Sequence, residues 1–385
     1  MAPTDTAIAD PLVQLGPAPA VAEHPAVRAA AATAADVLAP HARAADDPAH
    51  GVDPAHLALL AGQGLLSVTM PAAEGGHGAG DAVDTETVEL VSGACGATWF
   101  ICAQHRFPQH LARGPLPGLA PEAVTLGPAA QRHRAGLTDA STSAGIAIAH
   151  VRRPGPPAVR AEPAPGGGWT LHGTADWCTG WGLLDVVMIA GSTADDRFVL
   201  ALLPAREQPG LRATAPLPLA VMGGTRTVGL ELDGLEVDAE DVLGTVDAAA
   251  WRAHAAARTA NATPASFGLL RRVLTELHAL GLRRDRPEAV DAATALAAQA
   301  AACRAEAYAL RDEVPMFDRV PERAALRGRA GALAVRAANA LVAARSGSAL
   351  LATSPEQRWL REAAFHLVQA QTAAVRVAQL AALSR

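Results

Sequence analysis

The clearest indication of the architecture is the stretch Gly173-Thr174-Ala175-Asp176-Trp177-Cys178-Thr179-Gly180-Trp181. A turn rich in Gly and Pro at 163–168 comes before it, followed by the alternating run Trp-Thr-Leu-His at 169–172. That alternation predicts a strand entering a sheet. The apolar, β-branched run Val-Val-Met-Ile at 186–189 predicts the next strand. We therefore expect a strand–turn–strand tip that carries two indoles, a thiol and a hydroxyl.

The aromatic content of this tip has two interpretations. Trp177 and Trp181 are two of only six tryptophans in a chain of 385 residues that is 3% aromatic. A flat aromatic surface beside the hydroxyl of Thr179 suits a planar cofactor such as flavin. Alternatively, both indoles fill the core of a β-domain.

Composition excludes several classes of function. The chain has no lysine, so it lacks a Schiff-base nucleophile and a phosphate-binding loop of the GxxxxGK kind. The net charge of −6 is spread along the chain without a basic stripe, which argues against nucleic-acid binding. The four cysteines match neither a zinc pattern nor a disulfide framework. No leader or apolar span is visible, so we expect a cytoplasmic protein without a metal site or a membrane segment.

Three textures follow one another along the chain, and together they predict an α+β fold. Residues 1–22 are rich in Ala and Pro and predict a mobile tail. Helical patterns fill 23–125, with Asp53 as a capping residue before Pro54. Short β-branched runs separated by turns predict an antiparallel β-domain over 126–245. The remainder, 246–385, predicts a bundle of long helices.

Five segments in this order resemble motifs of the acyl-CoA dehydrogenase superfamily. The resemblance covers almost the whole chain, although no single segment is specific. The segments are Gly64-Leu65 with Pro71-Ala72-Ala73-Glu74-Gly75-Gly76, Thr138-Asp139-Ala140-Ser141-Thr142-Ser143, Trp177-Cys178-Thr179-Gly180, Met222-Gly223-Gly224-Thr225-Arg226-Thr227 with residues 237–244, and Gln357-Arg358-Trp359-Leu360-Arg361-Glu362.

The resemblance implies a flavin, FAD or FMN, between the β-domain and the C-terminal bundle. In that arrangement Thr138 faces the pyrimidine edge of the flavin and Trp177 packs near its ring system. Thr179 hydrogen-bonds near the N5–O4 edge, and Ser143 approaches the phosphate or the substrate.

The chain departs from the family where a dehydrogenase holds its catalytic carboxylate. The position nine residues after Arg361 is Ala370, and the other position used in the family falls near Arg258. Neither residue can abstract an α-proton.

The last helical segment instead carries His366, which resembles the histidine of the flavin-dependent monooxygenase branch of the superfamily. At helical spacing, Trp359, Ala363, His366 and Ala370 are expected on one face. An unperturbed histidine titrates near pH ~6.5, which suits a base at neutral pH. An interface histidine is the alternative interpretation.

A second helix adds candidates for a substrate pocket. The segment around Trp99 resembles one that is common in the monooxygenase branch, and His105 follows on the same helix. We therefore expect a pocket that includes Trp99, His105, Phe365 and Ala370, although a buried histidine is more often a satisfied core residue.

These observations predict a monooxygenase that oxidises a small organic molecule with dioxygen and reduced flavin from a separate reductase. His366 and Thr179 are the catalytic candidates. An acyl-thioester dehydrogenase or oxidase with a relocated base such as Glu362 is the first alternative, and a non-catalytic ligand-binding descendant is the second. The family resemblance implies a homodimer or homotetramer.

Overall fold

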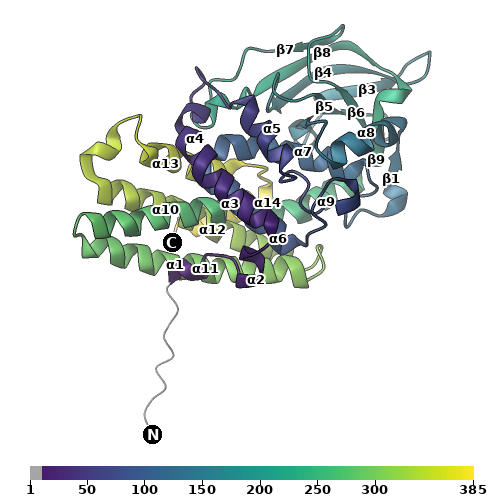
Figure 1. Ribbon diagram of the computed structural model, residues 1–385. Helices are drawn as coiled ribbons and strands as arrows, with labels where there is room; N and C mark the ends of the chain where they lie inside the picture. Colours follow the sequence, from purple (N-terminus) through teal and green to yellow (C-terminus); the bar gives the residue numbers. More distant parts are fainter. Residues whose placement is uncertain (1–10) are drawn as a thin grey trace. The chain divides into compact units, whose positions relative to one another are not determined.

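The structure is a computed structural model that describes residues 11–385. The chain divides into two compact units, each of which is described by itself. The first unit, Pro25–Arg258, contains helices and the whole sheet. The second joins the chain up to His24 with Thr259–Arg385 and is helical (Figure 1).

Helices open the first unit, as their sequence patterns predict. Asp53 begins α5 by accepting a 2.8 Å hydrogen bond from the amide of Ala55, and Pro54 takes the first helical position. A single π-helical segment, Ala34–Leu38, joins α3 to α4. The helices of this part are α3 Pro25–Thr33, α4 Ala39–Asp46, α5 Pro54–Gly62, α6 Asp81–Ala94 and α7 Gly96–Leu111.

One nine-stranded sheet follows, in the spatial order β1-β9-β6-β5-β3-β4-β8-β7, with β2 paired to β5. All neighbouring pairs are antiparallel except β2 with β5 and β3 with β5. The strands are β1 Val124–Leu126, β2 Ala144–Ala147, β3 Val159–Pro163, β4 Trp169–Cys178, β5 Val186–Ser192, β6 Arg197–Pro204, β7 Leu211–Ala213, β8 Val228–Val237 and β9 Val242–Asp247.

The region that we expected to be entirely β also contains a helix. α8, Pro128–Thr138, begins after the extended residue Gly127 and lies between β1 and β2. Its sequence, PAAQRHRAGLT, has too few apolar residues to show a helical period. Thr138 is the last residue of this helix.

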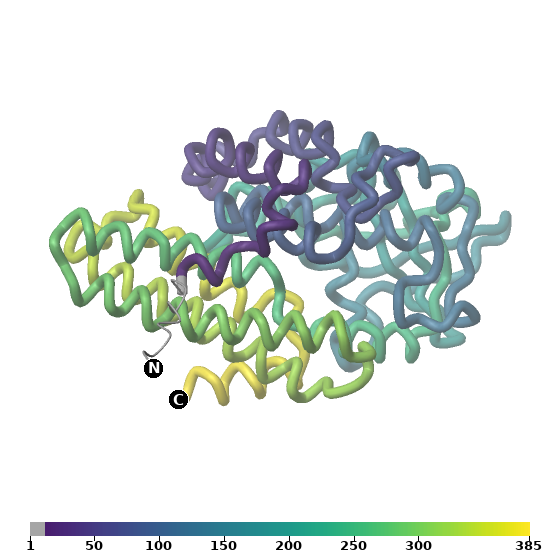
Figure 2. The backbone as a smooth tube through the Cα atoms, turned by 60° about the horizontal axis from the view of Figure 1, so that its bottom comes forward, coloured from purple at the N-terminus to yellow at the C-terminus, as the bar shows by residue number. Residues whose placement is uncertain are grey.

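The second unit begins later than the expected position 246. α9, Ala248–Ala260, packs Trp251 edge-on against Phe107 of α7, with 4.9 Å between the ring centroids. The start of α9 therefore belongs to the core of the first unit. The bundle itself consists of α10 Pro264–Arg283, α11 Pro287–Glu313, α12 Val320–Arg345, α13 Pro355–Val368 and α14 Ala373–Leu383 (Figure 2).

The expected N-terminal tail is partly structured. Residues 11–22 form two short helices, α1 Pro11–Gln14 and α2 Pro19–Ala22, whereas residues 1–10 lie outside the described part of the chain. Leu15 is completely buried in the apolar cluster that contains Phe267 of α10. Burial of Leu15 anchors this segment to the bundle, and the Ala- and Pro-rich composition of residues 1–22 gives no sign of it.

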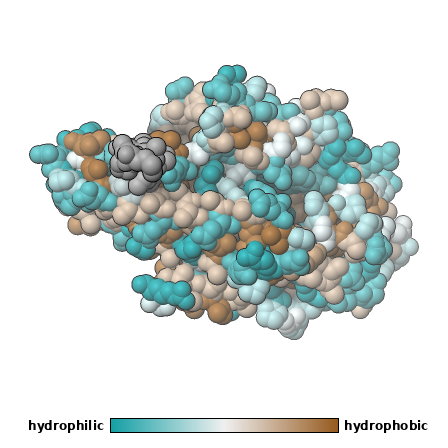
Figure 3. Space-filling view, turned by 90° about the horizontal axis from the view of Figure 1, so that it is seen from below, coloured by the Kyte–Doolittle hydropathy of each residue, from teal (hydrophilic) through white to brown (hydrophobic). Residues whose placement is uncertain are grey.

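No helix among residues 11–385 is long and apolar enough to cross a lipid bilayer. The face drawn in Figure 3 carries hydrophobic residues in patches between hydrophilic ones. On α14, three apolar side chains are exposed, Val377, Leu380 and Leu383. Single exposed apolar residues are normal, but a helix with three of them has an unusually apolar outer face.

Candidate functional site

Trp177 lies on a bulge of β4 and points its indole out of the core. The register with β8 shifts between Ala175 and Cys178, so that Asp176 and Trp177 face the single residue Gly229. Trp177 has φ = 64°, a left-handed conformation that a bulky residue rarely adopts, and its side chain is 49% exposed. A bulge re-aims a side chain, and backbone strain of this kind accumulates at functional sites. The exposed indole is therefore our first candidate for contact with a ligand.

Two residues further on, Thr179 begins a chain of three buried hydroxyl groups. Its Oγ1 lies 3.1 Å from Oγ1 of Thr227, which lies 2.9 Å from Oγ1 of Thr225. Thr225 donates its proton to the carbonyl oxygen of Met222 at 2.7 Å. The three threonines are at most 2% exposed, so this row of hydroxyl groups is shielded from water. Thr179 is therefore the member of this row that lies nearest to Trp177 in the sequence.

The loop that supplies Thr225 and Thr227 is itself strained. Met222 and Arg226 have φ values of 54° and 49° on either side of the short 3-10 turn Gly223–Thr225. The amide of Gly180 donates to the carbonyl of Thr225 at 2.9 Å, which fastens this loop to the tip. A side chain on Gly224 would approach the carbonyl oxygen of Ala45 to 2.2 Å, so only glycine fits there. The loop is thus hydrogen-bonded to the tip through Thr225 and packed against the backbone of Ala45 through Gly224.

Ser143 faces a carboxylate. Its amide and its hydroxyl both donate to Oδ2 of Asp185, at 2.7 Å and 2.8 Å. A negative charge at this point repels an anionic group, so this geometry disfavours the phosphate contact expected of Ser143. Thr138 ends α8 and is 1% exposed, with its hydroxyl 3.4 Å from the guanidinium of Arg113. Both residues belong to the first unit, and the Ser143 hydroxyl is committed to Asp185.

His105 supports the main chain. Its Nε2 lies 2.9 Å from the carbonyl oxygen of Leu137, and its Nδ1 accepts a hydrogen bond from the amide of Ala144 at 3.2 Å. Burial lowers the pKa of His105 to about 4. The ring is thus neutral and fully used within the core, which corrects its assignment to a substrate pocket. Trp99 is also buried, 7% exposed, with its ring 6.0 Å from that of Phe100.

The thiol at the tip is not a nucleophile. Cys178 is 2% exposed, and burial raises its pKa to about 12. The thiolate is the reactive form of cysteine, and it is essentially absent at neutral pH with such a pKa.

His366 lies on α13 in the second unit and is 6% exposed. Burial, with a smaller contribution from the nearby Arg327, lowers its pKa to about 3. The expected titration near neutral pH is therefore wrong. The ring of Phe365 lies 5.7 Å from that of His366 in an edge-on arrangement. A neutral imidazole can orient a ligand by hydrogen bonds, but it is a weak base at this pKa.

Ala370 does not share a helical face with His366. α13 ends at Val368, and Ala370 has φ = 45° in the connection to α14. The helix therefore ends two residues before Ala370, and the helical spacing that we extrapolated to position 370 does not apply there.

Glu362, the candidate for a relocated base, is committed to an ion pair. Its Oε1 lies 2.7 Å from Nη1 of Arg358 one turn earlier on α13, and both side chains are buried. The two positions at which the resemblance places a family carboxylate hold Ala370 and Arg258, and neither residue is acidic.

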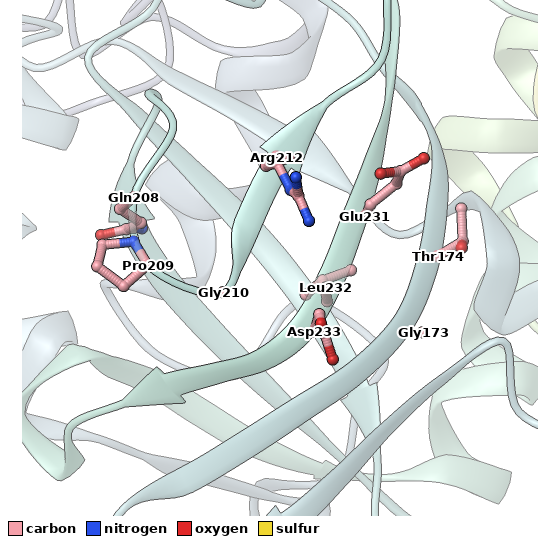
Figure 4. A pocket seen from close by; sticks show the side chains of 9 residues that line it. All are labelled: Gly173, Thr174, Gln208, Pro209, Gly210, Arg212, Glu231, Leu232 and Asp233. Carbon is pink, nitrogen blue, oxygen red and sulfur yellow. The ribbon is translucent and has the colours of Figure 1, made fainter.

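A separate open pocket of about 580 Å³ lies on the sheet at β4, β7 and β8. Arg212 and Glu231, which are registered neighbours on β7 and β8, point along this face, and Asp233 lies further along β8 (Figure 4). All three are exposed and charged. The residues that line this pocket do not include Trp177, Cys178 or Thr179, so the pocket is separate from the tip.

Sequence reasoning missed Thr225, Thr227 and Asp185. Thr225 and Thr227 occur in a segment quoted above for its resemblance to the family. Nothing in that segment connects Thr227 with Thr179, which is 48 residues away in the sequence. That connection exists only through the pairing of β4 with β8.

No protein-family model matches the chain, and no curated protein sequence matches it either. Solved structures do match it. Dibenzothiophene monooxygenase (TdsC) from Paenibacillus sp. A11-2 is 18% identical, with a TM-score of 0.74 over 92% of this chain and 95% of that one. Butyryl-CoA dehydrogenase from Megasphaera elsdenii is 15% identical, with a TM-score of 0.72 over 94% and 97% of the two chains. Glutaryl-CoA dehydrogenase from Mycobacterium smegmatis is 14% identical, with a TM-score of 0.72 over 93% of each. The chain therefore has the acyl-CoA dehydrogenase fold, as its motifs predicted.

Proposed function

We propose that this chain is a flavin-dependent oxidoreductase that uses reduced FMN or FAD and dioxygen to oxidise a small organic molecule. The observation that carries the proposal is the exposed indole of Trp177, held at a positive φ next to the buried hydroxyl of Thr179. One structure of the similar dibenzothiophene monooxygenase is a complex with FMN and indole. That enzyme supports a planar cofactor and an aromatic substrate for this chain.

The tip fits a flavin in its chemistry. An apolar plate of indole is suited to a planar ring, and a hydroxyl is suited to a ring edge that carries nitrogen and oxygen. When bound, reduced flavin would supply the two electrons that activate dioxygen. Trp177 would cover the ring, Thr179 would bind at the edge, and the surrounding apolar side chains would exclude water.

The dehydrogenase alternative has less support. Removal of an α-proton needs a carboxylate with an accessible lone pair. Glu362 is held by Arg358 at 2.7 Å in a buried pair, and the two positions at which the family places a carboxylate hold Ala370 and Arg258. These facts favour oxygen chemistry over α,β-dehydrogenation.

For His366, which lies in the second unit, we propose that a neutral imidazole orients a ligand by hydrogen bonds. A pKa of about 3 keeps the imidazole uncharged at neutral pH. We further propose a separate flavin reductase as the source of reduced flavin, and a homodimer or homotetramer as the assembled form.

A reconstituted reaction tests the proposal. The protein is mixed with FMN or FAD, NADH and an unrelated flavin reductase under ¹⁸O₂, with indole and dibenzothiophene as probe substrates. One labelled oxygen atom in the product, dependent on this chain, is the expected result. Anaerobic bleaching of bound oxidised flavin by an acyl-CoA would contradict it in favour of a dehydrogenase. A protein that takes up neither flavin would be a non-catalytic descendant.

A further inference from the structure

The open pocket on the sheet at β4, β7 and β8 has opposite hydrogen-bonding character on its two sides. β7 and the turn before it supply donors, which are the guanidinium of Arg212 and the side-chain amide nitrogen of Gln208. β8 supplies acceptors, the carboxylates of Glu231 and Asp233. Figure 4 shows Gln208 at one end of the pocket and the three charged side chains beyond it. The volume of about 580 Å³ lies within the usual range for a small-molecule site.

The opposite charges in this pocket do not neutralise one another. Arg212 and Glu231 are registered neighbours on adjacent strands, and such neighbours of opposite charge ordinarily attract each other. Nevertheless, within residues 11–385 the side chains of Arg212, Glu231 and Asp233 form neither an ion pair nor a hydrogen bond. All three charges therefore remain available to a ligand.

Gln208 provides an independent observation. Its Nε2 atom is buried and has no hydrogen-bond partner in the part of the chain that the structure describes. A buried donor without an acceptor is costly, so it requires an explanation. A carboxylate bound next to Arg212 would accept a hydrogen bond from this amide after a rotation of the Gln208 side chain.

The backbone holds the two sides of the pocket at a fixed spacing. The amide of Asp233 donates to the carbonyl of Gly210 at 3.0 Å, and Gln208 and Leu211 exchange two backbone hydrogen bonds at 3.2 Å and 2.9 Å. A side chain on Gly210 would lie 2.6 Å from Cα of Leu235, so the turn packs directly against the backbone of β8. The pocket is thus formed before a ligand arrives, and binding requires little ordering of the chain.

We propose that this pocket binds a small zwitterion, a molecule that carries one carboxylate and one ammonium group. Arg212 and Gln208 bind the carboxylate, and Glu231 and Asp233 bind the ammonium group. A ligand with a single charge fits less well, because an anion meets the two carboxylates and a cation meets the guanidinium. The inference goes beyond the proposed function and does not depend on it, since the pocket is separate from the tip.

Calorimetric titration of the full chain tests the inference with three probes that share one carbon skeleton: 4-aminobutyrate, butyrate and butylamine. We expect 4-aminobutyrate to bind at least about tenfold tighter than the other two, because each charged end adds hydrogen bonds to a charged group.

Two variants remove one side of the pocket each. Arg212→Gln should weaken 4-aminobutyrate about tenfold, to the level of butylamine, and Glu231→Gln should weaken it about tenfold, to the level of butyrate. Glu236→Gln makes the same change as Glu231→Gln on the same strand but outside the pocket, so this matched control should bind as the parent does. All three side chains are exposed, and thermal unfolding without ligand verifies that each variant is folded.

Three results would overturn the inference. The first is the absence of saturable 4-aminobutyrate binding to the parent. The second is an equal affinity of the parent, Arg212→Gln and Glu231→Gln, which would place the probe elsewhere on the protein. The third is butyrate or butylamine binding as tightly as 4-aminobutyrate, which would indicate a site for a single charge. Flavin uptake, measured separately, tests the proposed function and is independent of all three.

Discussion

Four hydrogen bonds join Asp185 to Ser143: its carboxylate accepts two, at 2.7 Å and 2.8 Å, and its amide donates to the hydroxyl and to the carbonyl oxygen of Ser143, both at 3.1 Å. The pair fastens the loop after α8 to the turn before β5. It therefore couples two of the segments that form the candidate site, and neither residue type announces this in the sequence.

Replacing Asp185 by alanine should loosen both segments. The variant loses the two hydrogen bonds that the exposed carboxylate accepts, which are worth about 1–2 kcal/mol together, so the free energy of unfolding in urea should fall by that amount. Flavin affinity should fall as well. Asp233→Ala removes the same charge from the exposed face of β8 and should leave both quantities unchanged. A destabilisation equal to that of this control would show that the Ser143–Asp185 pair contributes nothing.

Trp177 should be better replaced by glycine than by alanine. Glycine adopts φ = 64° freely, whereas a residue with a Cβ is strained there by about 1 kcal/mol. We expect Trp177→Gly to be at least as stable as the parent without ligand, and Trp177→Ala to be less stable than the glycine variant by about 1 kcal/mol. Both should lose flavin affinity, by fluorescence titration. Unaltered affinity in both variants would remove Trp177 from the site.

His366 should make the free energy of unfolding decrease as the pH falls below about 6.5. Its pKa is about 3 in the folded protein against 6.5 in the unfolded chain, so between these values only the unfolded chain binds the proton. Its favourable contribution is complete above pH 6.5 and is lost as the pH falls toward 3. His366→Gln should therefore lose less stability than the parent between pH 6.5 and 4, by on the order of a few kcal/mol. His105 and His110, whose pKa values are also lowered to about 4, titrate equally in both proteins. Parallel stability curves would contradict the buried neutral state of His366.

Glu362 should matter for folding and little for turnover. Glu362→Gln breaks the buried pair with Arg358 and should cost roughly 3 kcal/mol of unfolding free energy. Arg358→Met with Glu362→Leu should recover much of it, because an apolar pair needs no counter-charge. Turnover per folded molecule should change less than about threefold, whereas loss of a general base costs about 100-fold or more. A loss of that size with an acyl thioester would establish Glu362 as a base.

The sequence was sufficient for features that a local pattern encodes. Asp53 with Pro54 marked the start of α5, and the β-branched run at 186–189 predicted β5. α8 was missed because it lacks an apolar period, and α1 was missed because one leucine anchors it.

The candidate site was predicted only in part, for a physical reason. Trp177 and Thr179 were proposed from their residue types and spacing, and they remain proposals. The strain at Trp177 and the partners of Thr179 depend on the register of β4 with β8, which no local pattern specifies. The pKa of His366 likewise depends on burial, which a helical pattern does not quantify.

The central claim is that this chain binds reduced flavin and controls its reaction with oxygen. Stopped-flow mixing of oxygen with reduced FMN and excess protein tests it most directly. We predict a transient absorbance that matches neither reduced nor oxidised flavin and that disappears in Trp177→Ala. Reoxidation at the rate of free flavin, without a transient, would contradict the claim.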